Sequence, residues 1–192
     1  MVSELAKLIS KFEGGATAEI IKTQTTYLDF VCSPLDDPQS GAIHRIHFRG
    51  KRDFFLEKGM FTSLALLDEH PLLLEYTELH KDIYLSSAVP DKAKFVSDLE
   101  DAATMKFGGW RRLERYFNSM GLNEFLDKSY GLMMSAPASF VEMVIDVAKI
   151  NGVEINVLPG LKVQGKPQVL LLNNYYVVAD SFHAETMGCV SG

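Results

Sequence analysis

The sequence predicts an α+β fold, in which a mixed, largely antiparallel β-sheet packs against several helices. Three observations favour this class. Residues 42–49 alternate between apolar and polar side chains, as in a strand with one buried face. Residues 137–150 repeat apolar side chains at helical spacing between two short apolar segments, which predicts a C-terminal strand–helix–strand unit. Residues 169–178 form two apolar runs around Asn173-Asn174, which predicts a β-hairpin because Asn tolerates positive φ.

The N-terminal part of the chain is predicted to begin with a short amphipathic helix over residues 3–12, followed by Gly14-Gly15 as a stop signal. β-branched and aromatic residues then favour a strand from Glu19 to Cys32. The polar loop at residues 33–41 connects it to the alternating strand at 42–49. We therefore expect these two strands to form an antiparallel pair.

Two nearly continuous apolar runs, 60–67 and 72–76, indicate buried core strands, although runs this short could also be buried helix. The polar tetrad Asp68-Glu69-His70-Pro71 joins them. Proline cannot donate a hydrogen bond to a sheet, and it disfavours a helical conformation in the preceding residue. The tetrad is therefore interpreted as a tight connection.

The second half is predicted to alternate between strands and helices. We expect a strand over 82–87, a helix from Pro90 to Gly108, and shorter helical pieces over 110–118 and 122–127. In the strand–helix–strand unit, the strands at 130–135 and 153–157 are expected to be parallel, with a right-handed crossover.

Length and composition are typical of an ordinary globular protein, with 192 residues, 47% hydrophobic and 23% charged. They predict a single domain over 1–192, with a β-rich half at 1–88, an α/β half at 89–192 and a frayed tail at 186–192 as the alternative subdivision. No apolar run approaches the ~20 residues of a membrane span, and the N-terminus does not resemble a secretion signal. We therefore expect a soluble, cytoplasmic protein with no membrane partner.

The charge of the chain indicates which classes of partner it can bind. The net charge of −6 makes nucleic acid an unlikely ligand, because that affinity depends on neutralising phosphates with Lys and Arg. Residues 60–100 are rich in acids, whereas residues 45–52 are basic. This asymmetry is compatible with a homo-oligomer such as a homodimer. Cys32 and Cys189 do not suggest a disulfide in a reducing compartment, and their role stays open.

One candidate site is Asp68, Glu69 and His70. A carboxylate that orients an imidazole can make a general base, so these residues suggest a small hydrolase- or lyase-type enzyme. Side chains adjacent in sequence diverge, however, and no nucleophile or phosphate-loop motif supports catalysis. The favoured interpretation of the tetrad is a polar connection with no catalytic residues.

The other candidate is the basic stripe formed by Arg45, His47 and Arg49 on the polar face of the predicted strand. Arg45 and Arg49 would lie about 13 Å apart, a spacing that suits an extended anionic partner. The favoured interpretation of the stripe is instead an edge strand whose charges prevent aggregation. The histidine spacing and the absence of metal-binding motifs predict no metal site, and we expect no cofactor.

Two functions therefore remain open from sequence. The first and favoured one is a non-catalytic binding or protein-interaction domain, whose protein or small-molecule partner contacts the basic stripe or the acidic 60–100 region. The second is the enzyme that would use His70 with Asp68 or Glu69.

Overall fold

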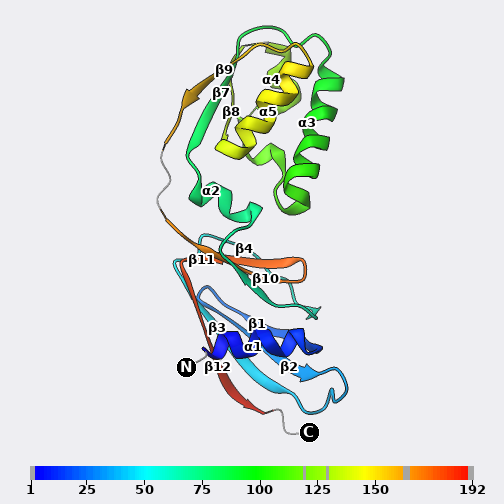
Figure 1. Ribbon diagram of the computed structural model, residues 1–192, viewed down its shortest axis with the longest axis vertical. Coiled ribbons are helices and arrows are strands. Elements are labelled where there is room, and N and C mark those ends of the chain that lie inside the picture. The colour runs from blue at the N-terminus through cyan, green and yellow to red at the C-terminus, as the bar shows by residue number, and fades with distance from the viewer. Residues whose placement is uncertain (1–2, 119, 129, 162–164, 190–192) are drawn as a thin grey trace. The chain divides into compact units, whose positions relative to one another are not determined.

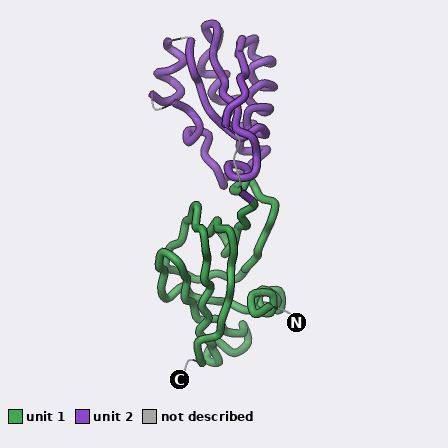
Figure 2. Tube along the Cα trace, turned by 90° about the vertical axis from the view of Figure 1, so that its left-hand side faces the viewer, with its two compact units in different colours: residues 1–73, 166–192 green, residues 74–165 purple. Residues whose placement is uncertain are grey.

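The computed structural model describes residues 3–118, 120–128, 130–161 and 165–189 (Figure 1). The chain forms two compact units (Figure 2). Unit 1 comprises Met1–Leu73 and Lys166–Gly192, and unit 2 comprises Leu74–Gly165. The subdivision considered at residue 88 therefore falls inside unit 2, and the chain returns to unit 1 only from Lys166 onward.

The α+β prediction is confirmed, and every pairing between the described strands is antiparallel. Unit 1 contains two sheets, with strand orders β12-β3-β2-β1-β5 and β4-β11-β10-β6. Its elements are α1 (Glu4–Glu13), β1 (Ala16–Thr23), β2 (Tyr27–Pro34), β3 (Ala42–Arg49), β4 (Asp53–Phe55), β5 (Met60–Phe61), β6 (Ala65–Leu67), the 3-10 helix η1 (Pro71–Leu73), β10 (Gln168–Leu172), β11 (Tyr175–Ala179) and β12 (Ser181–Cys189).

The core of unit 1 lies between these two sheets and helix α1. The predicted helix forms as expected, and the Ser3 hydroxyl caps it by accepting the N–H of Ala6. Phe12 of α1 stacks on Phe61, whose ring meets the edge of Phe30. Leu170 of the second sheet is fully buried in the same cluster. The apolar face of each element is thus buried against the others.

The predicted strand from Glu19 to Cys32 is in fact a hairpin. Strands β1 and β2 pair antiparallel, and the turn between them is closed by the N–H of Gln24 donating to the carbonyl of Tyr27. The β-branched pair Thr25-Thr26 lies in this turn. Because threonine favours strands, the sequence pattern did not indicate that β1 ends before β2 begins. The second predicted hairpin is confirmed, with Asn173 at φ 53° between β10 and β11.

Strand β3 occupies an interior position, between β2 and β12, so the edge-strand interpretation of its charges is wrong. The reason is β12, which follows directly on the second hairpin and was not predicted. Residues 186–189, which were expected to fray, belong to this strand. The rest of the expected tail lies outside the described residues.

Unit 2 consists of a three-stranded sheet with the order β8-β7-β9 and its helices. Strands β8 and β9 both run antiparallel to β7, so they are parallel to each other, as predicted, but β7 lies between them. The elements are α2 (Leu74–Thr77), β7 (His80–Leu85), α3 (Lys92–Phe107), η2 (Gly108–Trp110), η3 (Leu113–Arg115), α4 (Leu122–Lys128), β8 (Gly131–Pro137), α5 (Ala138–Ile150) and β9 (Ile155–Pro159).

The predicted strand at 72–76 is wrong, because this segment is helical from Pro71 to Thr77. Proline is pre-organised for the first position of a helix, and the N–H of Leu72 donates to Nδ1 of His70 at 3.2 Å, which caps the turn. The apolar residues Leu72 and Leu73 are buried as expected. A short apolar run cannot distinguish a buried strand from a buried helical turn.

Candidate functional site

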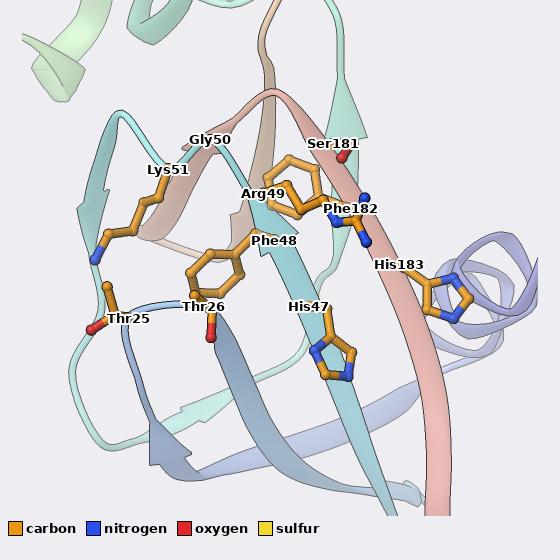
Figure 3. Close-up of a pocket in the computed structure, with 10 residues that line it drawn as sticks. All are labelled: Thr25, Thr26, His47, Phe48, Arg49, Gly50, Lys51, Ser181, Phe182 and His183. Carbon is orange, nitrogen blue, oxygen red and sulfur yellow. The ribbon is translucent and has the colours of Figure 1, made fainter.

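A cleft of about 890 Å³ opens in unit 1 where β3 ends and β12 begins (Figure 3). Two of the three residues of the predicted basic stripe, His47 and Arg49, line it. The other lining residues come from the β1–β2 turn, from the turn after β3 and from β12: Thr25, Thr26, Phe48, Gly50, Lys51, Ser181, Phe182 and His183.

The antiparallel register between β3 and β12 determines which side chains share the outer face of the sheet. His183 lies directly opposite His47, and Ser181 lies opposite Arg49. Directly opposed side chains in a sheet have Cβ atoms about 5 Å apart. His183 is therefore a neighbour of His47 and Arg49, although more than 130 residues separate it from them in the sequence.

Arg45 lies on the same face but does not line the cleft. Its guanidinium forms a two-point ion pair with Asp29, with Nε–Oδ1 at 2.7 Å and Nη2–Oδ2 at 2.9 Å. The guanidinium also lies over the ring of Tyr27, 4.1 Å from its centroid. This pair raises the pKa of Arg45 and neutralises its charge within the sheet. Arg45 therefore has a structural partner, and the predicted 13 Å pair of available cations is not present.

His47 is linked to the neighbouring strand β12. Its Nε2 lies 2.9 Å from Oε1 of Glu185, and this hydrogen bond is the main reason why the pKa of Glu185 is lowered. The imidazole thus reaches from β3 to β12 on the outer face. The other ring nitrogen of His47 is not used by this contact and remains available to a ligand in the cleft.

The other cationic side chains of the cleft are more available. Within the described part of the chain, neither Arg49 nor His183 forms an ion pair or a side-chain hydrogen bond, and both are exposed. The ammonium of Lys51 lies 3.9 Å from the centroid of the Phe54 ring, a contact that leaves its N–H groups free to bind a ligand. The cleft therefore carries an excess of positive charge.

A glycine and an ion pair shape the turn at the edge of this cleft. Gly50 adopts φ +63°, and a Cβ at this position would lie 2.1 Å from Oδ2 of Asp180. Asp180 in turn accepts hydrogen bonds from Arg52, with Nε–Oδ1 at 2.9 Å. The N–H of Asp180 donates to the carbonyl of Arg49 at 2.9 Å. Glycine is needed here because the carboxylate occupies the space of a side chain.

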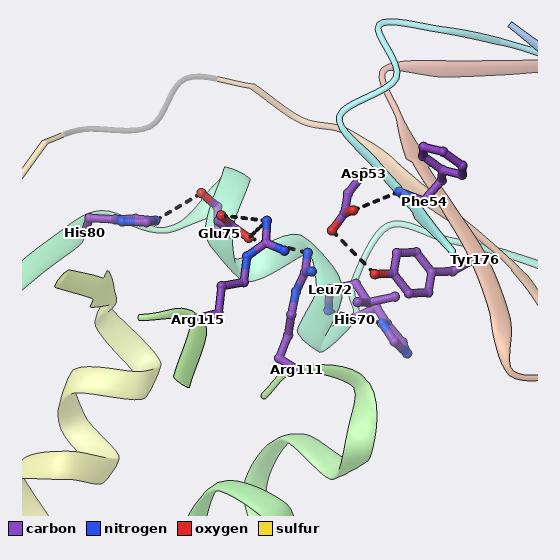
Figure 4. A network of polar contacts seen from close by, with 9 residues as sticks. All are labelled: Asp53, Phe54, His70, Leu72, Glu75, His80, Arg111, Arg115 and Tyr176. Atoms are coloured by element: carbon purple, nitrogen blue, oxygen red, sulfur yellow. Dashed lines mark hydrogen bonds and ion pairs between the residues drawn. The ribbon is translucent and has the colours of Figure 1, made fainter. Parts of the chain in front are cut away.

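The polar tetrad Asp68-Glu69-His70-Pro71 lies elsewhere in unit 1 and lines none of the cavities described. Asp68 accepts a hydrogen bond from Nε2 of Gln168 at 2.8 Å, and Asp68 and Glu69 are exposed. His70 caps the turn of η1 through Leu72, as Figure 4 shows. These bonds give Asp68 and His70 structural roles, and the catalytic interpretation stays a prediction without added support.

Figure 4 also shows a polar cluster within unit 2, around the carboxylate of Glu75. Arg115 lies 3.2 Å and Arg111 3.5 Å from Oε2 of Glu75, and the side chain of Arg111 is almost fully buried. The hydroxyl of Tyr116 is buried and has no hydrogen-bond partner among the residues that the structure describes, and burial raises its pKa. This cluster fixes η2, η3 and α2 in place, which is a structural role.

Sequence reasoning missed the part of the cleft that β12 and the β1–β2 turn provide. His183 and Ser181 follow Asp180 in a segment without a motif, and Thr25 and Thr26 were placed inside a strand. The only available signal was the polar–apolar alternation of residues 181–185, which is short and weak.

Comparison with known proteins adds no assignment: no family model, curated protein or solved structure matches this chain. Among the residues placed by the structure, no group of three or more His, Cys, Asp or Glu side chains could hold a metal ion. None of the helices in that part is long and apolar enough to cross a membrane.

Proposed function

We propose that this protein is a non-catalytic binding protein, and that the cleft at the end of β3 and the start of β12 binds the phosphate group of a phosphorylated ligand. The observation that carries the proposal is the guanidinium of Arg49, which has no counter-ion among the described residues and lies at a cleft that two opposed histidines also line.

The donor set of the cleft supports phosphate over a smaller anion. A phosphate presents three oxygens that accept several hydrogen bonds, whereas a carboxylate is satisfied by one arginine. Arg49 offers a planar fork of N–H groups, and His183 and Lys51 add further donors. The hydroxyls of Thr26 and Ser181 lie at the same cleft. Together these groups can surround a dianion.

The aromatic lining indicates where the rest of the ligand would lie. Phe182 is half-buried and lies opposite Phe48 across the strand pair, with ring centroids 6.4 Å apart. Phe48 is buried, so only the half-buried ring of Phe182 could contact a ligand, which favours a ligand with an apolar or flat portion as well as a charged group. The enzyme alternative based on His70 with Asp68 or Glu69 has no comparable support.

Isothermal titration calorimetry with phenyl phosphate tests the proposal. We expect binding to the intact protein, weaker at high salt because the attraction is ionic. Arg49→Met should lower the affinity about ten-fold or more, since a charge-assisted contact is removed. Lys58→Met is the matched control, because Lys58 is an exposed cation of unit 1 that does not line the cleft. Equal affinity in both variants, or no binding to the intact protein, would refute the proposal.

A further inference from the structure

A second cavity lies in unit 1, beside the C-terminal end of α1. Its volume is about 640 Å³, within the range that takes a small organic ligand. Residues from α1, from the start of β1, from the end of β2 and from the loop before β3 contribute to it. The lining residues that matter below are Lys11, Ala16, Cys32, Leu35, Asp36 and Ala42.

Lys11 is the cation of this cavity, and a buried histidine holds it. Nζ of Lys11 lies 3.4 Å from Nε2 of His44, and Nδ1 of His44 lies 3.2 Å from the hydroxyl of Thr186. Because an ammonium can only donate, Nε2 is the acceptor and the proton is on Nδ1, which donates to Thr186. The imidazole is therefore neutral, consistent with its burial, and burial and Lys11 lower its pKa.

This arrangement leaves Lys11 without a counter-ion in the described part of the chain. A neutral imidazole satisfies one of its three N–H bonds, and no carboxylate forms an ion pair with it. Its neighbour Lys7, by contrast, is paired with Glu4 at 2.6 Å. The ammonium of Lys11 therefore retains donors that a ligand can use.

The walls of the cavity are mainly apolar. Ala16 and Cys32 are buried, and Ala42 is half-buried. The side chain of Leu35 is 66% exposed, an unusual position for a leucine next to a cavity. A ligand that covers Leu35 would remove this apolar surface from water. The only carboxylate in the lining is Asp36, which disfavours a ligand of high negative charge.

We infer that this cavity binds an amphipathic monocarboxylate, with the carboxylate on Lys11 and the apolar chain along Ala16, Leu35 and Ala42. One cation matches one negative charge, and the apolar walls match an aliphatic or aromatic tail. This cavity shares no lining residue with the cleft at the end of β3 and the start of β12, so the inference does not depend on the phosphate proposal.

Calorimetric titration with sodium octanoate tests the inference, with 1-octanol and inorganic phosphate as comparison ligands. We expect octanoate to bind more tightly than either, because octanol lacks the charge and phosphate lacks the tail. Lys11→Met keeps the aliphatic stem and should lower octanoate affinity about ten-fold. Lys7→Met, on the same helix but outside the cavity, should leave it unchanged. Equal binding of octanoate and octanol, or equal affinity in Lys11→Met, would overturn the inference.

A second measurement needs no variant. Cys32 lines the cavity, whereas Cys189 is exposed and lies outside it. The reaction rate of Cys189 therefore serves as an internal control for that of Cys32. Octanoate should slow the alkylation of Cys32 by N-ethylmaleimide, followed by mass spectrometry, and leave the rate at Cys189 unchanged. Unchanged alkylation of Cys32 at saturating octanoate would place the ligand elsewhere and refute the assignment.

Discussion

Arg45 and Asp29 form a two-point ion pair across the strands β3 and β2, in the interior of the five-stranded sheet. The side chain of Asp29 is only 9% exposed, although it carries a charge. The pair neutralises Arg45 within the sheet. Within the basic stripe, the available positive charge therefore lies at the end of β3, where Arg49 lines the cleft.

Asp29→Asn should destabilise the protein by about 1–3 kcal/mol, because it leaves a partly buried guanidinium without its carboxylate. Chemical denaturation followed by circular dichroism measures this loss. Asp36→Asn is the matched control, since Asp36 is exposed and forms no ion pair with any of the described residues. If both variants unfold at the same denaturant concentration, the pair contributes no stability.

Gly50→Ala should cost about 2 kcal/mol or more, and it should also weaken phosphate binding at the cleft. A Cβ in the left-handed region is strained, and here it would displace the Asp180 carboxylate from Arg52. Thermal unfolding and the phenyl phosphate titration measure the two effects. Gly109→Ala serves as the comparison, because a Cβ there meets no atom within 4 Å. Equal stability of the two variants would contradict the role assigned to Gly50.

Glu78→Gln should destabilise unit 2 by about 1 kcal/mol. Helix α5 begins at Ala138 without a side-chain cap from Pro137, and Glu78 supplies the missing acceptor. Its Oε2 accepts the N–H of Ser139 at 2.7 Å, and its other oxygen accepts the Ser139 hydroxyl. The negative charge also suits the helix N-terminus. Glu142→Gln, at an exposed position on the same helix, should change the free energy of unfolding much less.

His44 should make the stability of unit 1 depend on pH. Its pKa is lowered in the folded protein from the ordinary value of 6.5, so the unfolded chain binds the proton more readily. The free energy of unfolding should therefore rise with pH up to about 6.5, and fall as the pH drops below that value. Urea titrations between about pH 5 and pH 7.5 measure this slope.

His44→Gln isolates the effect, because glutamine cannot titrate in this range but can still hydrogen-bond with Lys11 or Thr186. In this variant the free energy of unfolding should change less steeply with pH between about pH 5 and 6.5, because unfolding no longer takes up a proton at residue 44. An identical slope in both proteins would mean that other groups carry the pH dependence.

The local elements of this fold were largely predictable from sequence. Helical spacing identified α1 and α5, and alternation identified β3 with its buried face at His44, Ile46 and Phe48. These signals are local, since each depends on side chains within one element. The exceptions are informative: the β1–β2 turn contains threonines that favour strands, and Pro71 begins a helical turn where an apolar run had suggested a strand.

The candidate site was only half predictable, because it depends on pairing between distant segments. The polar face of β3 indicated His47 and Arg49, which line the cleft, but nothing near Arg45 in the sequence indicated that Asp29 neutralises it. His183 became part of the site only through the register of β12 on β3. Register across more than 130 residues is set by tertiary packing, which a single sequence does not display.

The most direct test of the phosphate-binding proposal is a residue-by-residue map of amide chemical shifts during titration of the ¹⁵N-labelled protein with phenyl phosphate. The account predicts that the largest shifts occur at Thr26, at residues 47–51 and at residues 181–183, and that Arg49→Met moves their midpoint to a phenyl phosphate concentration about ten-fold higher or more. Shifts centred on Asp68–Pro71, or spread evenly over both units, would contradict it.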